Sequence, residues 1–145
     1  MSITRAVLTI AAMVVVLFIV SNWFVGKRYK TIVSGDTPIT IGPGQVRYYR
    51  LPLNATQHNP HITGHFLTFG GSGNDIEVFI ADEEDFGKLM NDRQAQIYYD
   101  SDKTTSGTID AQLPTGNETY YVVFSNRFSV ISTKTVTADV SMSYE

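Results

Sequence analysis

The chain has 145 residues, no cysteine and a formal net charge of −3. The missing cysteine excludes disulfides, thiolate catalysis and cysteine-based zinc sites. All 14 acidic residues but only 7 of the 11 basic residues follow residue 30, so residues 31–145 carry a net charge of −7. This acidity argues against nucleic-acid binding, because it repels phosphate backbones.

An uncharged run of 20 residues, Ala6 to Val25, opens the chain. As a helix it would span about 30 Å, the thickness of the hydrocarbon core of a bilayer. Trp23 and Tyr29 lie where an interfacial aromatic belt is expected. Residues 1–30 are therefore predicted to form a single-pass transmembrane anchor, with a basic flank of Lys27, Arg28 and Lys30. The alternative is a cleaved signal peptide, but its apolar region would ordinarily be about 7–15 residues long.

The orientation of this anchor is open. The three basic residues after the span, against Arg5 before it, favour a cytoplasmic domain. The abundance of Thr, Ser, Asn and Tyr favours the other side, as do two glycosylation-type triplets that begin at Asn54 and Asn117. We expect the domain on the extracytoplasmic (periplasmic or lumenal) side, with the cytoplasmic side as the alternative.

Short β-forming runs separated by turn residues fill residues 31–145. The expected strands are residues 31–34, 38–41, 45–51, 62–69, 76–81, 94–99, 108–113, 120–124 and 134–144. Between them, residues 82–92 begin with acids and place Phe86, Leu89 and Met90 at helical spacing, which predicts one or two helical turns. Residues 100–107 are expected to be a polar loop. The pattern predicts an all-β domain, an antiparallel sandwich of about seven or eight strands.

Alternation within the strands indicates which side chains face the core. Ile76, Val78 and Ile80 are expected to point inward, and Glu77 and Phe79 to point to the opposite face.

Three adjacent tyrosine pairs, at residues 48–49, 98–99 and 120–121, are expected to place one ring inside and one outside. Outward aromatic rings suit protein or carbohydrate contacts, although ordinary β-propensity also accounts for them. The interaction candidates are Trp23, Tyr29, Tyr49, Tyr99 and Tyr121.

The end of the chain carries a family resemblance. Residues 124–129 (FSNRFS), 134–136 (KTV) and 139–140 (DV) resemble the end of the GOLD domain of the p24 (emp24-type) cargo receptors, and residues 76–82 resemble an earlier strand of that domain. The resemblance implies a GOLD-like or jelly-roll-like sandwich with a general binding role. The motif residues are Phe124, Ser125, Asn126, Phe128, Lys134 and Asp139.

Two departures limit what this resemblance implies. Val123 occupies the position where p24 proteins usually carry a disulfide cysteine. In that family the membrane helix follows the domain, whereas here the expected anchor precedes it. The resemblance therefore implies a fold and a binding role rather than vesicle-cargo trafficking.

The same residues also have a local interpretation. Phe124 and Phe128 can anchor a tight connection, Ser125 and Asn126 can hydrogen-bond nearby backbone, and Lys134 can pair with an acid. This favours closure of a hairpin over direct contact with a ligand.

Two clusters contain residue types that bind metals. His58, His61 and His65 include common metal ligands, but four residues of extended strand span about 13 Å, so His61 and His65 cannot share one ion without a bend. The acids of residues 82–85 could hold calcium, yet they match no EF-hand loop and are typical of a helix start. No metal or cofactor is expected.

The sequence contains no nucleophile elbow and no phosphate-binding loop, so we expect no enzyme. The first functional expectation is a non-catalytic accessory or assembly subunit that contacts membrane proteins and the bilayer within a larger membrane complex. The alternative is a module that binds a carbohydrate or a lipid head group at the membrane surface.

Overall fold

The computed structural model describes residues 26–71 and 73–145. The predicted anchor at residues 6–25 and the interaction candidate Trp23 lie outside these residues. Within the described part, no helix is long and apolar enough to cross a bilayer. The first strand begins at Arg28, inside the expected basic flank.

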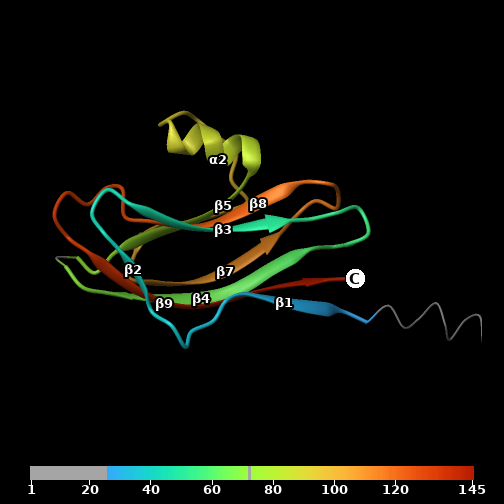
Figure 1. Cartoon of the computed structure of the whole chain (residues 1–145), viewed down its shortest axis with the longest axis horizontal. Coiled ribbons are helices and arrows are strands. Elements are labelled where there is room, and N and C mark those ends of the chain that lie inside the picture. Colours follow the sequence, from blue (N-terminus) through green and yellow to red (C-terminus); the bar gives the residue numbers. More distant parts are fainter. Residues whose placement is uncertain (1–25, 72) are drawn as a thin grey trace, which may run out of the picture.

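Two antiparallel sheets pack face to face (Figure 1). Sheet A consists of β1 (Arg28–Val33), β2 (Ile39–Ile41), β4 (His61–Phe69), β7 (Ser106–Gln112) and β9 (Lys134–Tyr144). Sheet B consists of β3 (Val46–Pro52), β5 (Ile76–Asp82), β6 (Tyr99–Thr104) and β8 (Thr119–Ser125). In sheet A the strand order is β1-β9-β4-β7, and β2 also pairs with β9; in sheet B the order is β3-β8-β5-β6. The predicted all-β antiparallel sandwich is confirmed, with nine strands in the described chain.

The main core lies between the sheets. Strand β9 shows the expected alternation, with Val136, Ala138, Val140 and Met142 buried against sheet B. Ile76, Val78 and Ile80 of β5 face them from the other sheet, as their spacing predicts.

A second, smaller core lies on the outer face of sheet B. It contains Phe79, Ala81, Tyr121 and Val123, and helix α2 (Glu83–Met90) covers it. Phe79 does point away from the main core, but it is buried rather than exposed. The apolar spacing in residues 82–92 predicts helical turns, but it does not identify the surface on which they pack. Figure 1 shows α2 over sheet B, while no helix of the described chain covers the outer face of sheet A.

The prediction for the segment after α2 was wrong. Residues 93–97 form no strand, and β6 occupies Tyr99–Thr104, most of which was expected to be a loop. This strand lies at the edge of sheet B and bulges where it pairs with β5. There the Ser101 hydroxyl accepts a hydrogen bond from the backbone N–H of Val78 (2.8 Å). Polar residues are tolerated at such an edge because their side chains remain in solvent.

The two ends of the sandwich differ. The start of β1 and the end of β9 lie together at one end (Figure 1). The connection between β8 and β9, residues 126–133, lies at the opposite end, which we call the distal end.

Candidate functional site

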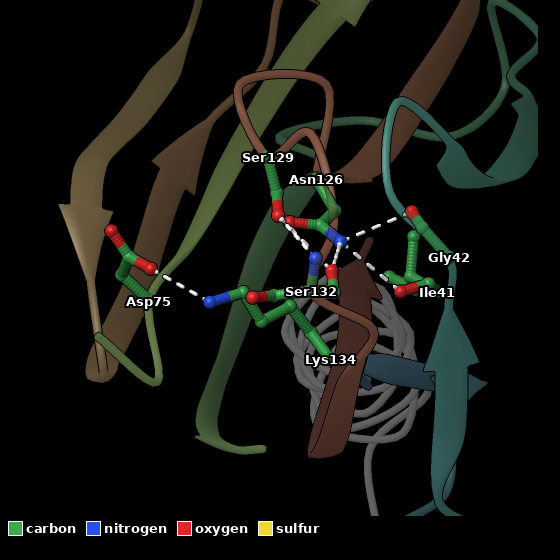
Figure 2. Close-up of polar contacts among 7 residues, drawn as sticks. All are labelled: Ile41, Gly42, Asp75, Asn126, Ser129, Ser132 and Lys134. Carbon is green, nitrogen blue, oxygen red and sulfur yellow. Dashed lines mark hydrogen bonds and ion pairs between the residues drawn. The ribbon is translucent and has the colours of Figure 1, made fainter. Parts of the chain in front are cut away.

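The β8–β9 connection is braced by Asn126, which is fully buried (Figure 2). Its side-chain amide donates hydrogen bonds to the carbonyls of Ile41 (3.2 Å), Gly42 (3.0 Å) and Ser132 (2.7 Å). One side chain thus ties the connection to itself and to the β2–β3 turn. This is the backbone bonding that the motif suggested, extended to a segment more than 80 residues earlier.

An ion pair between a buried lysine and a partly exposed acid closes the same region. The Lys134 side chain is 1% exposed, and its Nζ lies 2.9 Å from Oδ1 of Asp75 (Figure 2). The hydrogen bond from Lys134 holds the pKa of the Asp75 carboxyl below its ordinary value, against the opposing effect of burial. Asp75 is therefore the acid that pairs with Lys134, as the position of this lysine predicts.

Of the other residues of the motif, Phe124 and Ser125 are buried in the sandwich. Asp139 lies on the outer face of sheet A and accepts a hydrogen bond from the backbone N–H of Gly35 (2.7 Å). Phe128 differs, because it is partly exposed and lines a cleft.

This cleft has a volume of about 550 Å³ and lies beside α2 on the outer side of sheet B. Its lining comes from β5, β6, α2 with the segment that follows it, and residues 125–128. The apolar lining residues are Phe79, Leu89, Met90, Ile97 and Phe128. The charged lining residues are Glu77, Asp92, Asp100, Arg93, Lys103 and Arg127. The lining thus combines apolar side chains with three acids and three bases, whose formal charges cancel.

Arg127 holds two walls of the cleft together. Its guanidinium donates to the carbonyl of Leu89 (2.7 Å) at the end of α2 and to Oδ1 of Asp92 (2.9 Å) in the turn that follows. On the other side, Nζ of Lys103 lies 4.7 Å from the centre of the Phe128 ring, within the range of a cation–π contact. The cleft is therefore set by contacts between segments far apart in the chain.

Glu77 is half-buried in this cleft. Burial, followed by the nearby negative charge of Asp100, raises the pKa of the Glu77 carboxyl above its ordinary value, and Lys103 partly opposes this shift. Glu77 and Lys103 lie directly opposite each other in the β5–β6 register. The cleft wall therefore carries a hydrogen-bond acceptor directly opposite a donor.

The tyrosine candidates do not form a common surface. Tyr121, expected outside, is only 7% exposed and lies in the second core. Tyr49 and Tyr99 are half-buried and pack against the main core. The exposed rings are Tyr29 (73%) and Tyr48 (50%). The outward assignment of Tyr121 failed because helix α2 buries the face to which its ring points.

The three histidines do not converge. Nε2 of His61 lies 2.6 Å from Asp110, and that of His65 lies 3.7 Å from Asp139, whereas His58 is exposed in a loop. In the part of the chain that the structure describes, no group of three potential ligands could hold a metal ion.

The acidic run at residues 82–85 is used by the helix itself. The carboxylate of Asp82 caps α2 by accepting from the N–H of Asp85 (2.9 Å), and Lys88 pairs with Glu84 (2.8 Å) and Asp85 (2.7 Å). These contacts account for the run as a helix start.

Sequence reasoning missed the cleft, because its residues come from separated segments with no shared motif. The one local signal was Arg127-Phe128 inside the FSNRFS stretch, a cation next to an aromatic ring.

No protein-family model matches the chain, and no curated protein is similar to it in sequence. Among solved structures, a carbohydrate-binding module of family 29 is similar at 7% identity, with a TM-score of 0.49 over 81% of this chain and 92% of that chain. A Cellvibrio japonicus xylanase in complex with xylopentaose is similar at 13% identity, with a TM-score of 0.43 over 82% and 27% of the two chains. The mitogen of Yersinia pseudotuberculosis is similar at 9% identity, with a TM-score of 0.39 over 82% and 86%. Similarity at these levels assigns neither a family nor a ligand to this chain.

Proposed function

We propose that the protein is a non-catalytic binding module that holds an uncharged carbohydrate in the cleft beside α2. The observation that carries the proposal is the composition of that cleft, which combines apolar side chains with three acids and three bases.

The chemistry of a sugar fits such a lining. A sugar ring has an apolar C–H face, which packs on aromatic and aliphatic side chains, and an edge of hydroxyls that both donate and accept hydrogen bonds. Phe128 and Leu89 offer the apolar contact, and Glu77 and Lys103 offer an acceptor and a donor. A charged ligand is less suited, because the formal charges of the lining cancel. The volume lies within the range of about 300–1,000 Å³ that is typical of small-ligand sites.

The membrane setting belongs to the same proposal. The run at residues 6–25 would anchor the module, with the cleft on the extracytoplasmic side, where polysaccharides are found. The resemblance to the GOLD domain and the role as an accessory subunit of a membrane complex stay predictions.

The test is glycan binding by the full chain, purified in a mild non-glycosidic detergent. A glycan array would identify the ligand, and calorimetry would then compare Phe128→Ala with Phe69→Ala. Phe69 is the matched control, because it is exposed on sheet A, away from the cleft. Loss of an aromatic contact weakens binding by about tenfold or more.

A second pair of variants tests the charged hydrogen-bond donor of the cleft instead of the aromatic contact. Lys103→Ala is expected to weaken binding, whereas Lys30→Ala on β1 leaves it unchanged. Binding to no glycan on the array, or equal loss in the cleft and control variants, contradicts the proposal. A uronic acid preferred over its neutral parent sugar would contradict the choice of an uncharged ligand.

A further inference from the structure

Two aliphatic side chains project from the distal end of the sandwich. Val130 is 88% exposed and Ile131 is 87% exposed, the highest values among the exposed large hydrophobic residues of the described chain. Both lie in the β8–β9 connection, and neither lines the cleft proposed for carbohydrate.

The connection that carries them is held from both sides. The Ser129 hydroxyl donates to the carbonyl of Ser132 (3.1 Å) and accepts from the Ser132 N–H (3.0 Å), which closes the chain around Val130 and Ile131. Asn126 also bonds the Ser132 carbonyl and fixes the base of the connection to the β2–β3 turn (Figure 2). Folding back to bury the two side chains would break these bonds. The structure therefore maintains their exposure.

We propose that Val130 and Ile131 insert into the interfacial region of a zwitterionic phospholipid bilayer. Insertion removes both side chains from water, and it needs no complementary shape in the partner.

Val130 and Ile131 together form a small tip, and its size favours lipid over protein as the partner. Two side chains present far less than the roughly 800 Å² per partner that a stable protein interface or dimer buries. Charge selects the kind of lipid. Residues 31–145 carry a net charge of −7, and Arg127 beside the tip is paired with Asp92 (2.9 Å). At low salt, where charges act over about 30 Å, an anionic surface would therefore repel the domain, whereas a zwitterionic surface would not.

The contact is separate from the predicted N-terminal anchor. The connection lies at the end of the sandwich opposite the start of β1 (Figure 1), and β1 begins only three residues after the predicted span, so the tip would enter a second bilayer rather than the one that holds the anchor. The readout must therefore be local to the tip, since the rest of the chain is expected to bind lipid as well.

The chain contains no cysteine, so one introduced thiol is labelled uniquely. Val130→Cys in the full chain would carry an environment-sensitive fluorophore, with the protein kept in solution by amphipol. The matched control is Thr63→Cys, an exposed position on the outer face of sheet A. Phosphatidylcholine vesicles, with and without nitroxide-labelled acyl chains, would then be added.

The expected result is a shift to shorter emission wavelength and nitroxide quenching at position 130, with neither at position 63. Ile131→Ser in the Val130→Cys background should reduce both signals, and replacing part of the phosphatidylcholine by phosphatidylserine at low salt should weaken them. Matching melting temperatures would show that the variants are folded.

A water-like spectrum at position 130 in the presence of vesicles overturns the proposal, whether or not the chain binds them. An emission already shifted before lipid is added, together with a doubled mass in light scattering, overturns it in favour of a second copy as the occupant. Stronger insertion into phosphatidylserine vesicles overturns the choice of a zwitterionic surface.

Discussion

The ring of Tyr121 on β8 stacks on the ring of Phe86 on α2, with centroids 4.3 Å apart and planes 11° from parallel. The Tyr121 hydroxyl also donates to Glu83 in the first turn of the helix (3.1 Å). This pair fixes α2 over the second core and so positions the C-terminal end of the helix as a wall of the cleft.

Phe86→Ala is expected to lower the free energy of unfolding by about 2 kcal/mol, because Phe86 is only partly buried. Urea unfolding measures the loss, and near-ultraviolet circular dichroism should show a weaker aromatic signal. The control is Tyr121→Phe, which keeps the stacked ring and loses only the bond to Glu83, at a cost of about 1 kcal/mol. If Phe86→Ala costs no more than Tyr121→Phe, the stack does not hold the helix.

Asn126→Asp keeps the shape of the side chain but turns two donors into a carboxylate that faces three carbonyl oxygens. An uncompensated buried charge costs about 3–5 kcal/mol, and a loss of this size is expected at pH 7. The matched control is Asn117→Asp, an exposed position whose side chain accepts from the N–H of Ala55 (2.9 Å). Thermal unfolding of both variants checks the prediction, and similar melting temperatures would contradict it.

The ion pair of Asp75 with Lys134 predicts a dependence of stability on pH. Because the folded pKa of Asp75 is lowered, its contribution is present above the ordinary carboxyl pKa and is lost as the pH falls through the folded value. Asp75→Asn should therefore cost about 1.5–3 kcal/mol at pH 7, the range for hydrogen bonds to charged groups. The difference from the wild type should shrink toward pH 2.

Urea unfolding at several pH values measures this effect. Asp36→Asn, at an exposed turn, serves as the control and should change stability little at any pH. A cost for Asp75→Asn that is the same at pH 2 and pH 7 would assign it to packing rather than to charge.

Gly64 on β4 pairs with Val140 on β9. A Cβ at this position would collide with the backbone carbonyl of Asp139 and lie 2.9 Å from the Cα of Val140. Gly64→Ala is therefore expected to push the two strands apart and to cost about 1–3 kcal/mol. Gly116→Ala is the control, because a methyl group added there would meet nothing within 4 Å. Equal melting temperatures for the two variants would show that sheet A accommodates the added methyl group without losing stability.

For Glu77, the predicted dependence of stability on pH is opposite to that of Asp75. Its folded pKa is raised, so it favours the fold most at low pH and loses this contribution as the pH rises through the folded value. Glu77→Gln should melt at or above the wild-type temperature at pH 7. Any gain in melting temperature over the wild type should disappear near pH 4. Glu118→Gln, at an exposed position, is the control. A lower melting temperature for Glu77→Gln at pH 7 would mean that attraction to Lys103 outweighs burial.

The strands with strict alternation could be predicted from the sequence. Lys134–Tyr144 is a strand over the expected residues, and Ile76, Val78 and Ile80 face the core as expected. Strand β6 was not predictable in this way, because an edge strand with solvated side chains has no apolar period. The burial of Phe79 and Tyr121 depends on where α2 folds back, and alternation within one strand carries no information about that.

The candidate site was less accessible to sequence reasoning. The FSNRFS stretch pointed to Asn126, and the KTV stretch that follows it pointed to Lys134; their roles in closing the sandwich follow from local chemistry. The cleft depends on Arg127 meeting the end of α2 almost 40 residues earlier and on Lys103 meeting Phe128. Such meetings are set by the strand order β8-β5-β6, which no local pattern encodes.

Strand β9 pairs with β1, β2 and β4, and its register joins Arg28 to Tyr144. During synthesis on the ribosome, these three earlier strands must wait for Lys134–Tyr144 to emerge before sheet A can form. Such distant pairings fold slowly, and until then the edges of the waiting strands are open to other chains. The edges of these strands in a nascent chain therefore stay unpaired until the eleven residues of β9 have left the tunnel.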